Sequence, residues 1–187
     1  MTIHQLQATL VMEQDRILVR LNTHAGEELR LWLTRRMVKY LFPQLLKAST
    51  EAATAQTRFA SYDGADRSAL TQFKKQESLL QADFSTPFIN QATALPIGAV
   101  PLLATTVHIT ACEGGALRLG FEENLADSTG PRSFEVTLGP DLIHGFLHLL
   151  ESALQHADWG LGLKLDSGAK EPEAAISATG ERPQYLN

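Results

Sequence analysis

Two histidines and a carboxylate in the segment 141–156 have the spacing of metal ligands. His144 and His148 are four residues apart and Glu151 follows, so a helix places all three on one side. Imidazole and carboxylate groups are donors that zinc and similar ions accept. The segment lacks the internal glutamate of the H-E-x-x-H motif and therefore offers no base for hydrolysis. We favour the simpler interpretation, a solvated polar face of an amphipathic helix, and keep metal-dependent activity as an alternative.

Arginines and one tryptophan occupy alternate positions of runs whose other positions are apolar. Successive side chains of a strand point to opposite faces, so these residues would share the outward face of the predicted sheet. They are Arg16, Leu18, Arg20, Arg30, Trp32 and Arg118. Such a face can hold single-stranded nucleic acid by phosphate contact and base stacking, although Glu28 and Glu135 dilute its charge. Exposed apolar side chains such as Leu18 and Trp32 also mark protein contacts, and we expect an interface with another subunit or partner.

Three cations stand in the first turns of a predicted helix. The helix begins after Thr34, which is a suitable N-cap, and the cations are Arg35, Arg36 and Lys39. Positive side chains oppose the helix dipole at this end, so the placement costs some stability. Together with the free N–H groups of the first turn they form a candidate anion site. The alternative is a basic helix end that is solvated or paired with acidic groups elsewhere.

No residue pattern of the chain specifies a reaction. Cys112 is the only cysteine, so it can form no intrachain disulfide, and no residue near it in sequence has the character of a catalytic partner. The glycines that follow it lack the lysine and the spacing of a phosphate-binding loop. We therefore expect a protein that is not an enzyme and needs no cofactor, although catalytic groups can converge from distant segments.

Charge and composition narrow the class of partner. The 187 residues carry a formal net charge of -5 and are 44% hydrophobic, as in an ordinary globular protein. The negative charge disfavours bulk attraction to nucleic acid or to an anionic membrane surface. The N-terminal sequence does not have the order of a signal peptide, and no apolar run approaches the ~20 residues of a membrane-spanning helix. We expect a cytoplasmic protein whose partner is a second copy of itself or another protein.

The elements that would position these residues follow from the periodicity of the apolar side chains. Residues 1–57 contain three period-two runs and then a helical pattern, which predicts a meander followed by a helix; Pro43 would kink that helix or start a second segment. Residues 58–101 predict a further helix and an extended connector held against the core. Residues 102–160 repeat the βββα order. Residues 161–187 are polar and aperiodic, and we expect a mobile tail.

The two βββα patterns can be aligned on one another. The apolar positions of the second runs recur at an offset of 100 residues, those of the third runs and of the helices at 105, and those of the first runs at 101. The match is one of pattern, with almost no identity. It fits duplication of a βββα unit, and it also fits any two meanders that are each followed by a helix. In both cases we predict an α+β fold in which the two units share one domain, with antiparallel sheet and helices on one face.

Overall fold

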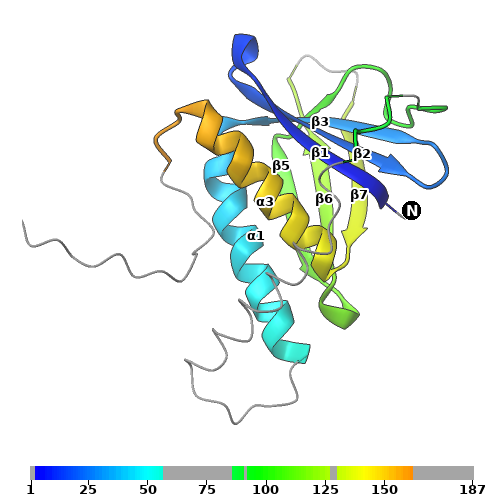
Figure 1. Ribbon diagram of the computed structural model, residues 1–187. Coiled ribbons are helices and arrows are strands. Elements are labelled where there is room, and N and C mark those ends of the chain that lie inside the picture. The colour runs from blue at the N-terminus through cyan, green and yellow to red at the C-terminus, as the bar shows by residue number, and fades with distance from the viewer. Residues whose placement is uncertain (1–2, 57–85, 91, 127–129, 162–187) are drawn as a thin grey trace, which may run out of the picture.

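The computed structural model describes residues 3–56, 86–90, 92–126 and 130–161 and shows an α+β fold, as the sequence predicts (Figure 1). The first half of the described chain forms β1 (Ile3–Val11), β2 (Arg16–Thr23), β3 (Glu28–Thr34) and the helix α1 (Arg35–Gln56). The second half forms β4 (Leu102–Leu103), β5 (Thr106–Ala111), β6 (Leu117–Glu123), β7 (Arg132–Leu138) and the helix α3 (Pro140–Ala157). The helix predicted over residues 66–82 and the tail from residue 162 lie outside the described residues.

The strands form two sheets, each built on an antiparallel meander. Sheet 1 has the order β1-β2-β3-β4, and sheet 2 has the order β5-β6-β7. The sequence did not predict β4, which runs parallel to β3 with Leu102 opposite Leu31 and Leu103 opposite Trp32. Two residues are too few to show a period-two pattern. Because β4 also contacts β6, this short strand lies where the two sheets approach each other.

The apolar positions that align between the two halves of the sequence pair in the same way in the two sheets. The corresponding pairs are Ile17 with Leu33 and Leu117 with Leu138, Val19 with Leu31 and Leu119 with Val136, and Leu21 with Leu29 and Phe121 with Phe134. All of these side chains except Phe134 are buried. A slip of one residue would turn them to the other face, so the buried alternation fixes the register in both sheets. This correspondence is one of architecture, and duplication stays a hypothesis.

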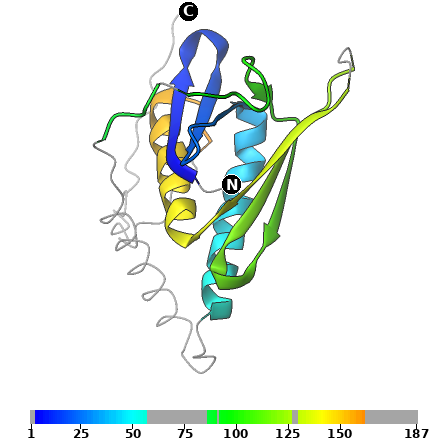
Figure 2. The ribbon, with the colours of Figure 1, turned by 90° about the vertical axis from the view of Figure 1, so that its right-hand side faces the viewer.

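Both sheets and both helices enclose one hydrophobic core. The helices α1 and α3 pack against each other, α3 contacts β1, and α1 contacts β3, β5 and β6 (Figure 2). Each helix contributes large buried side chains, Phe42 and Leu45 from α1 and Ile143 and Leu147 from α3. Burying one such side chain contributes about 1.5–3 kcal/mol. The inner faces of the sheets are thus used for folding, which leaves their outer faces for other roles.

The start and the continuity of α1 each test a prediction. Oγ1 of Thr34 accepts a hydrogen bond from the N–H of Met37 at 3.2 Å, which confirms Thr34 as the N-cap. The helix continues through Pro43, so the expectation that a second segment could start there is wrong. The Pro43 side chain is exposed, whereas Phe42 and Leu45 beside it are buried. Packing on the core therefore offsets the backbone hydrogen bond that the proline removes.

The described part of the connector between the two units is held against sheet 1 by hydrogen bonds, whereas the sequence predicted apolar contacts with the core, and Ile89 is exposed. Nε2 of Gln5 donates to the carbonyl oxygen of Pro87 at 3.3 Å, and Oε1 of Gln5 accepts from the N–H of Ile89 at 2.9 Å. Further along, the N–H of Thr93 donates to the carbonyl oxygen of Gly26 at 2.8 Å. Gly26 has a φ of +78°, and a Cβ atom there would lie 2.7 Å from Oγ1 of Thr93. This close turn therefore requires a glycine.

Candidate functional site

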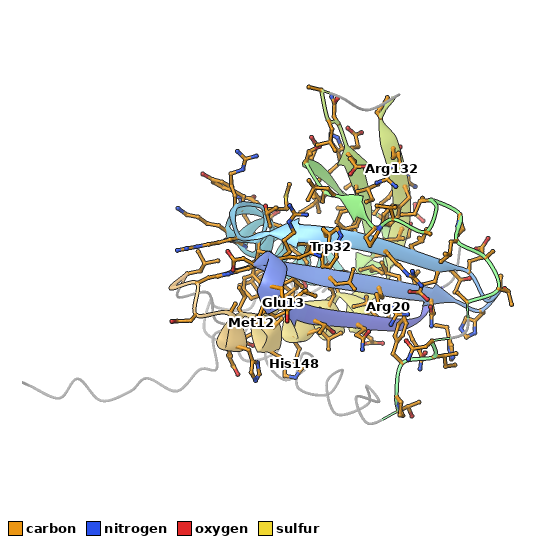
Figure 3. All side chains as sticks on the ribbon, turned by 90° about the horizontal axis from the view of Figure 1, so that it is seen from above. Met12, Glu13, Arg20, Trp32, Arg132 and His148 are labelled. Atoms are coloured by element: carbon orange, nitrogen blue, oxygen red, sulfur yellow. The ribbon has the colours of Figure 1, made fainter. Side chains whose placement is uncertain are left out.

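The outer face of sheet 1 carries five of the six residues that were predicted to share one surface (Figure 3). These five, all half-buried, are Arg16, Leu18, Arg20, Arg30 and Trp32. The sixth residue, Arg118, is exposed on β6 and belongs to sheet 2. The candidate surface therefore lies on sheet 1, and sheet 2 does not contribute to it.

A buried glutamate organises one half of this face. Oε1 of Glu28 accepts hydrogen bonds from Nε of Arg20 at 2.7 Å and from Nε of Arg30 at 2.6 Å, and the Glu28 side chain is fully buried. Burial raises the pKa of Glu28, but the hydrogen bonds and positive charges of the two arginines outweigh it and hold this pKa below its usual value. The sequence identified Glu28 only as a charge that dilutes the arginines, because strand alternation does not show which side chains meet.

The connector covers the same half of the face. The guanidinium carbon of Arg20 lies 4.4 Å from the centroid of the Phe88 ring, and Nη1 of Arg20 donates to Oδ1 of Asn90 at 2.7 Å. Nδ2 of Asn22 donates to the carbonyl oxygen of Ile89 at 2.9 Å. Arg20 therefore uses Nε, Nη1 and its planar face within the protein, and a phosphate would have to displace these contacts. This arrangement weakens the nucleic-acid hypothesis for this half of the face.

The other half of the face is apolar. Thr9, Leu18, Trp32 and Leu103 stand opposite one another across the four strands of sheet 1. We name Leu18, Trp32 and Leu103 the apolar row; each of the three is half-buried. Figure 3 shows Trp32 and Arg20 at separate places along the sheet. The sequence identified Leu18 and Trp32, whereas Leu103 was missed because β4 has no periodicity of its own.

The predicted anion-site residues lie at the end of sheet 1 where β3 passes into α1. Arg35, Arg36 and Lys39 are exposed, and Arg16 stands opposite Thr34, the residue that precedes α1. Among the described residues, none of the four cations forms an ion pair. The structure thus brings Arg16 of the outer face together with the three cations of the helix start.

The predicted metal ligands lie on α3. The side chains of His144, His148 and Glu151 are each half-buried. Within the part of the chain that the structure describes, no three His, Cys, Asp or Glu side chains are grouped so that they could hold one ion. The metal hypothesis therefore continues to rest on sequence spacing alone.

Comparisons with known proteins leave the function to be argued from these surfaces. No family model, curated protein or solved structure matches the chain. Across the described ranges, no helix has the length and the apolar character needed to cross a membrane. The outer face of sheet 1 and the basic end beside it are the features that carry the functional argument.

Proposed function

We propose that this protein acts without catalysis, through contacts with other proteins, and that the outer face of sheet 1 is its contact surface. The observation that carries the proposal is the apolar row, which crosses three neighbouring strands in half-buried positions. Aliphatic and aromatic side chains gathered at one place on a surface are what protein contacts bury. Tryptophan in particular is among the residue types that dominate binding energy at interfaces.

Sheet 2 provides an internal comparison for this proposal. Its outer face carries Thr110, Arg118 and Thr137, which stand opposite one another and are all exposed. Polar side chains of this kind are expected when the second face of an antiparallel sheet meets water. Arg118 and Thr137 align with Leu18 and Trp32 at the offsets of the two units. Sheet 1 therefore departs from the solvated pattern at the positions where sheet 2 follows it.

The experiment compares two glutamate substitutions at aligned positions. Trp32→Glu places a charge in the apolar row, and Thr137→Glu places the same charge on the outer face of sheet 2. Native mass spectrometry and light scattering give the subunit number of each variant, and affinity capture gives the proteins that it retains. We expect Trp32→Glu to lose a self-association or a captured partner that the wild type and Thr137→Glu both keep. Trp32→Ser serves as a second variant, and circular dichroism checks that each protein is folded.

Two results would overturn the proposal. One is a folded Trp32→Glu protein with the same subunit number and the same captured proteins as the wild type. The other is a wild-type protein that remains a monomer and retains no partner in any of these measurements. A second copy of the chain and a different protein are both compatible with the proposal, and the subunit number distinguishes them.

We also infer that the two βββα units derive from duplication of one unit. The support is the equivalent pairing of the aligned apolar positions in β2–β3 and in β6–β7, together with the helix that follows each meander. The test is a comparison of sequence profiles built separately from relatives of each unit. Duplication predicts that the two profiles match over all four elements, and profiles that align no better than those of unrelated βββα proteins would contradict it.

A further inference from the structure

A basic cluster adjoins the apolar row at one end of sheet 1. It consists of Arg16, Arg35, Arg36 and Lys39, which we name the basic cluster. Arg16 precedes Leu18 by two residues on the same face of β2, which corresponds to about 7 Å along a strand. Arg16 also pairs with Thr34, which directly precedes α1. The β3–α1 junction thus joins the outer face of sheet 1 to the first turns of α1.

The cations of this cluster differ from Arg20, Arg30 and Arg132, three other arginines of the two meanders, in that those three are paired with a carboxylate. Arg20 and Arg30 share the carboxylate of Glu28, and Arg132 pairs with that of Glu123. The basic cluster has no such partner among the residues described, and three of its four side chains are exposed. Among the described residues, these four cations thus gather at one place without an ion pair, on a chain whose net charge is -5.

The position of the cluster on α1 is unfavourable for the isolated protein. Cations in the first turn of a helix oppose its dipole, so Arg35 and Arg36 lower the stability of α1. Arg36, Lys39 and Tyr40 lie on one side of the helix, and Tyr40 is 63% exposed. A local choice that costs stability and leaves an aromatic ring in water is expected at functional places. A negatively charged partner would relieve the repulsion.

We propose that the contact surface binds an acidic, partly apolar segment of another protein. The apolar side chains of that segment pack on the apolar row, and its carboxylates pair with the basic cluster. The inference rests on the proposed function, which supplies the apolar half of the surface, and adds the chemical class of the partner. Charge complementarity then sets the orientation of the bound segment, because the cluster lies at only one end of the row.

A protein segment fits this surface better than a nucleic acid does. Two of the arginines on the outer face, Arg20 and Arg30, are bound to Glu28. Trp32 stands between Leu18 and Leu103, and aliphatic neighbours favour side-chain packing over base stacking. Outside the cluster the net charge of the chain is negative and would repel a polyphosphate that extends beyond it. A short acidic segment that remains within the cluster experiences less of this repulsion.

The test measures the binding of three fluorescent probes by anisotropy at low and at physiological ionic strength. The probes are a short peptide of alternating glutamate and leucine, a peptide of glutamate alone, and an oligothymidylate of equal charge. We expect the alternating peptide to bind most tightly. Arg36→Glu should weaken its binding by about fivefold or more, whereas Arg118→Glu, the same charge reversal on sheet 2, should leave the affinity within about twofold. Trp32→Ala should weaken binding of the alternating peptide but not binding of the glutamate peptide.

The outcomes separate this inference from the proposed function. If Trp32→Ala weakens peptide binding but Arg36→Glu weakens it no more than Arg118→Glu does, the proposed contact surface is supported. The inference that its partner is acidic is then wrong. If Arg36→Glu weakens binding of the alternating peptide and Trp32→Ala does not, the apolar row does not contribute to binding. Both the proposed function and the inference of a partly apolar partner are then wrong. Tighter binding of the oligothymidylate than of either peptide would assign the cluster to nucleic acid. Binding of none of the probes at low ionic strength would also overturn the inference.

Discussion

The two meanders have equivalent inner faces and unlike outer faces. On the inner side the aligned apolar residues pair in the same register and enter one core. On the outer side Arg20 and Arg30 face each other in sheet 1, whereas Gly120 and Glu135 stand at the aligned positions of sheet 2. The two meanders keep equivalent pairing although their outer faces differ, as expected where a buried face specifies the register. The outer face of each sheet can therefore carry its own chemistry.

A buried glutamate links each sheet to the connector, but by different routes. In sheet 1, Glu28 holds Arg20, which reaches the connector at Asn90. In sheet 2, Oε1 of Glu123 accepts from the N–H of Leu103 in β4, the strand that follows the connector, at 3.0 Å. Arg132, which pairs with Glu123, donates to the carbonyl oxygen of Val100 at 3.0 Å. The described part of the connector is thus held at Asn90 and at Val100 by arginines that each pair with a carboxylate.

The largest effect that we predict is the loss of stability on removal of the Glu28 carboxylate. Glu28→Ala leaves Arg20 and Arg30 without their shared counter-charge in a place where the glutamate is fully buried. Breaking a buried ion pair by removing one partner costs about 3–5 kcal/mol, and we expect a loss of unfolding free energy of about this size. Urea denaturation measures it. The control is Glu135→Ala, an exposed glutamate on sheet 2, for which we expect a change within about 0.5 kcal/mol. Equal losses in the two variants would show that the Glu28 cluster has no special role.

The second prediction concerns the core that the two units share. Leu119 in β6 and Val19 in β2 are aligned, and both side chains are buried. Leu119→Ala should lower the unfolding free energy by about 2–5 kcal/mol, and Val19→Ala by a similar or smaller amount. Both tryptophans lie outside sheet 2, since Trp32 belongs to β3 and Nε1 of Trp159 donates to Oδ1 of Asp15.

Tryptophan fluorescence therefore reports whether sheet 2 and the first unit unfold together. We expect Leu119→Ala to shift the fluorescence transition and the far-ultraviolet circular dichroism transition to the same lower midpoint. Separate midpoints, or a fluorescence transition that Leu119→Ala leaves in place, would indicate two units that unfold independently.

The fold could be predicted to the extent that one face of an element is uniformly apolar. The alternation of Ile17, Val19 and Leu21 and the helical spacing of Leu41 and Leu45 are local signals, so β2 and α1 follow from them. The position of β4 depends on contacts with β3 and β6, which are distant in sequence, and two residues carry no periodic signal.

The candidate site could be predicted only in part, for the same reason. Alternation placed Arg20, Arg30 and Trp32 on one face, and that face is where they lie. Alternation could not show that Glu28 would be buried between the two arginines or that Phe88 would cover one of them. The Phe88 contact depends on the path of the connector, which is distant from Arg20 in sequence. The Glu28 contacts depend on side-chain conformations that alternation does not specify.

The third prediction concerns the pH dependence of stability that Glu28 contributes to sheet 1. The pKa of Glu28 in the folded protein lies below its ordinary value of 4.5, so folding favours the ionised carboxylate. The stability that this group contributes is fully present above its unfolded-state pKa and is lost as the pH falls through the lower folded-state pKa. Glu28→Gln removes the titration, and we expect its stability to depend less on pH than that of the wild type as the pH falls below about 4.5. The measurement is the denaturation midpoint of each protein at a series of acidic pH values. If the midpoints of the wild type and of Glu28→Gln fell in parallel, Glu28 would not contribute to the pH dependence of stability.

The smallest predicted effects concern the two helix starts, which differ as the outer faces do. Oγ1 of Thr34 caps α1, whereas Gly139 precedes α3 without any side-chain cap and has open space around its Cβ position. Thr34→Ala should destabilise the protein by about 1 kcal/mol, and Gly139→Ser should stabilise it by a few tenths of a kcal/mol, because a serine can supply the missing acceptor. Thermal denaturation measures both. Glycine is itself a tolerated N-cap, so the gain from Gly139→Ser should be smaller than the loss from Thr34→Ala. A gain as large as that loss would contradict the explanation by capping.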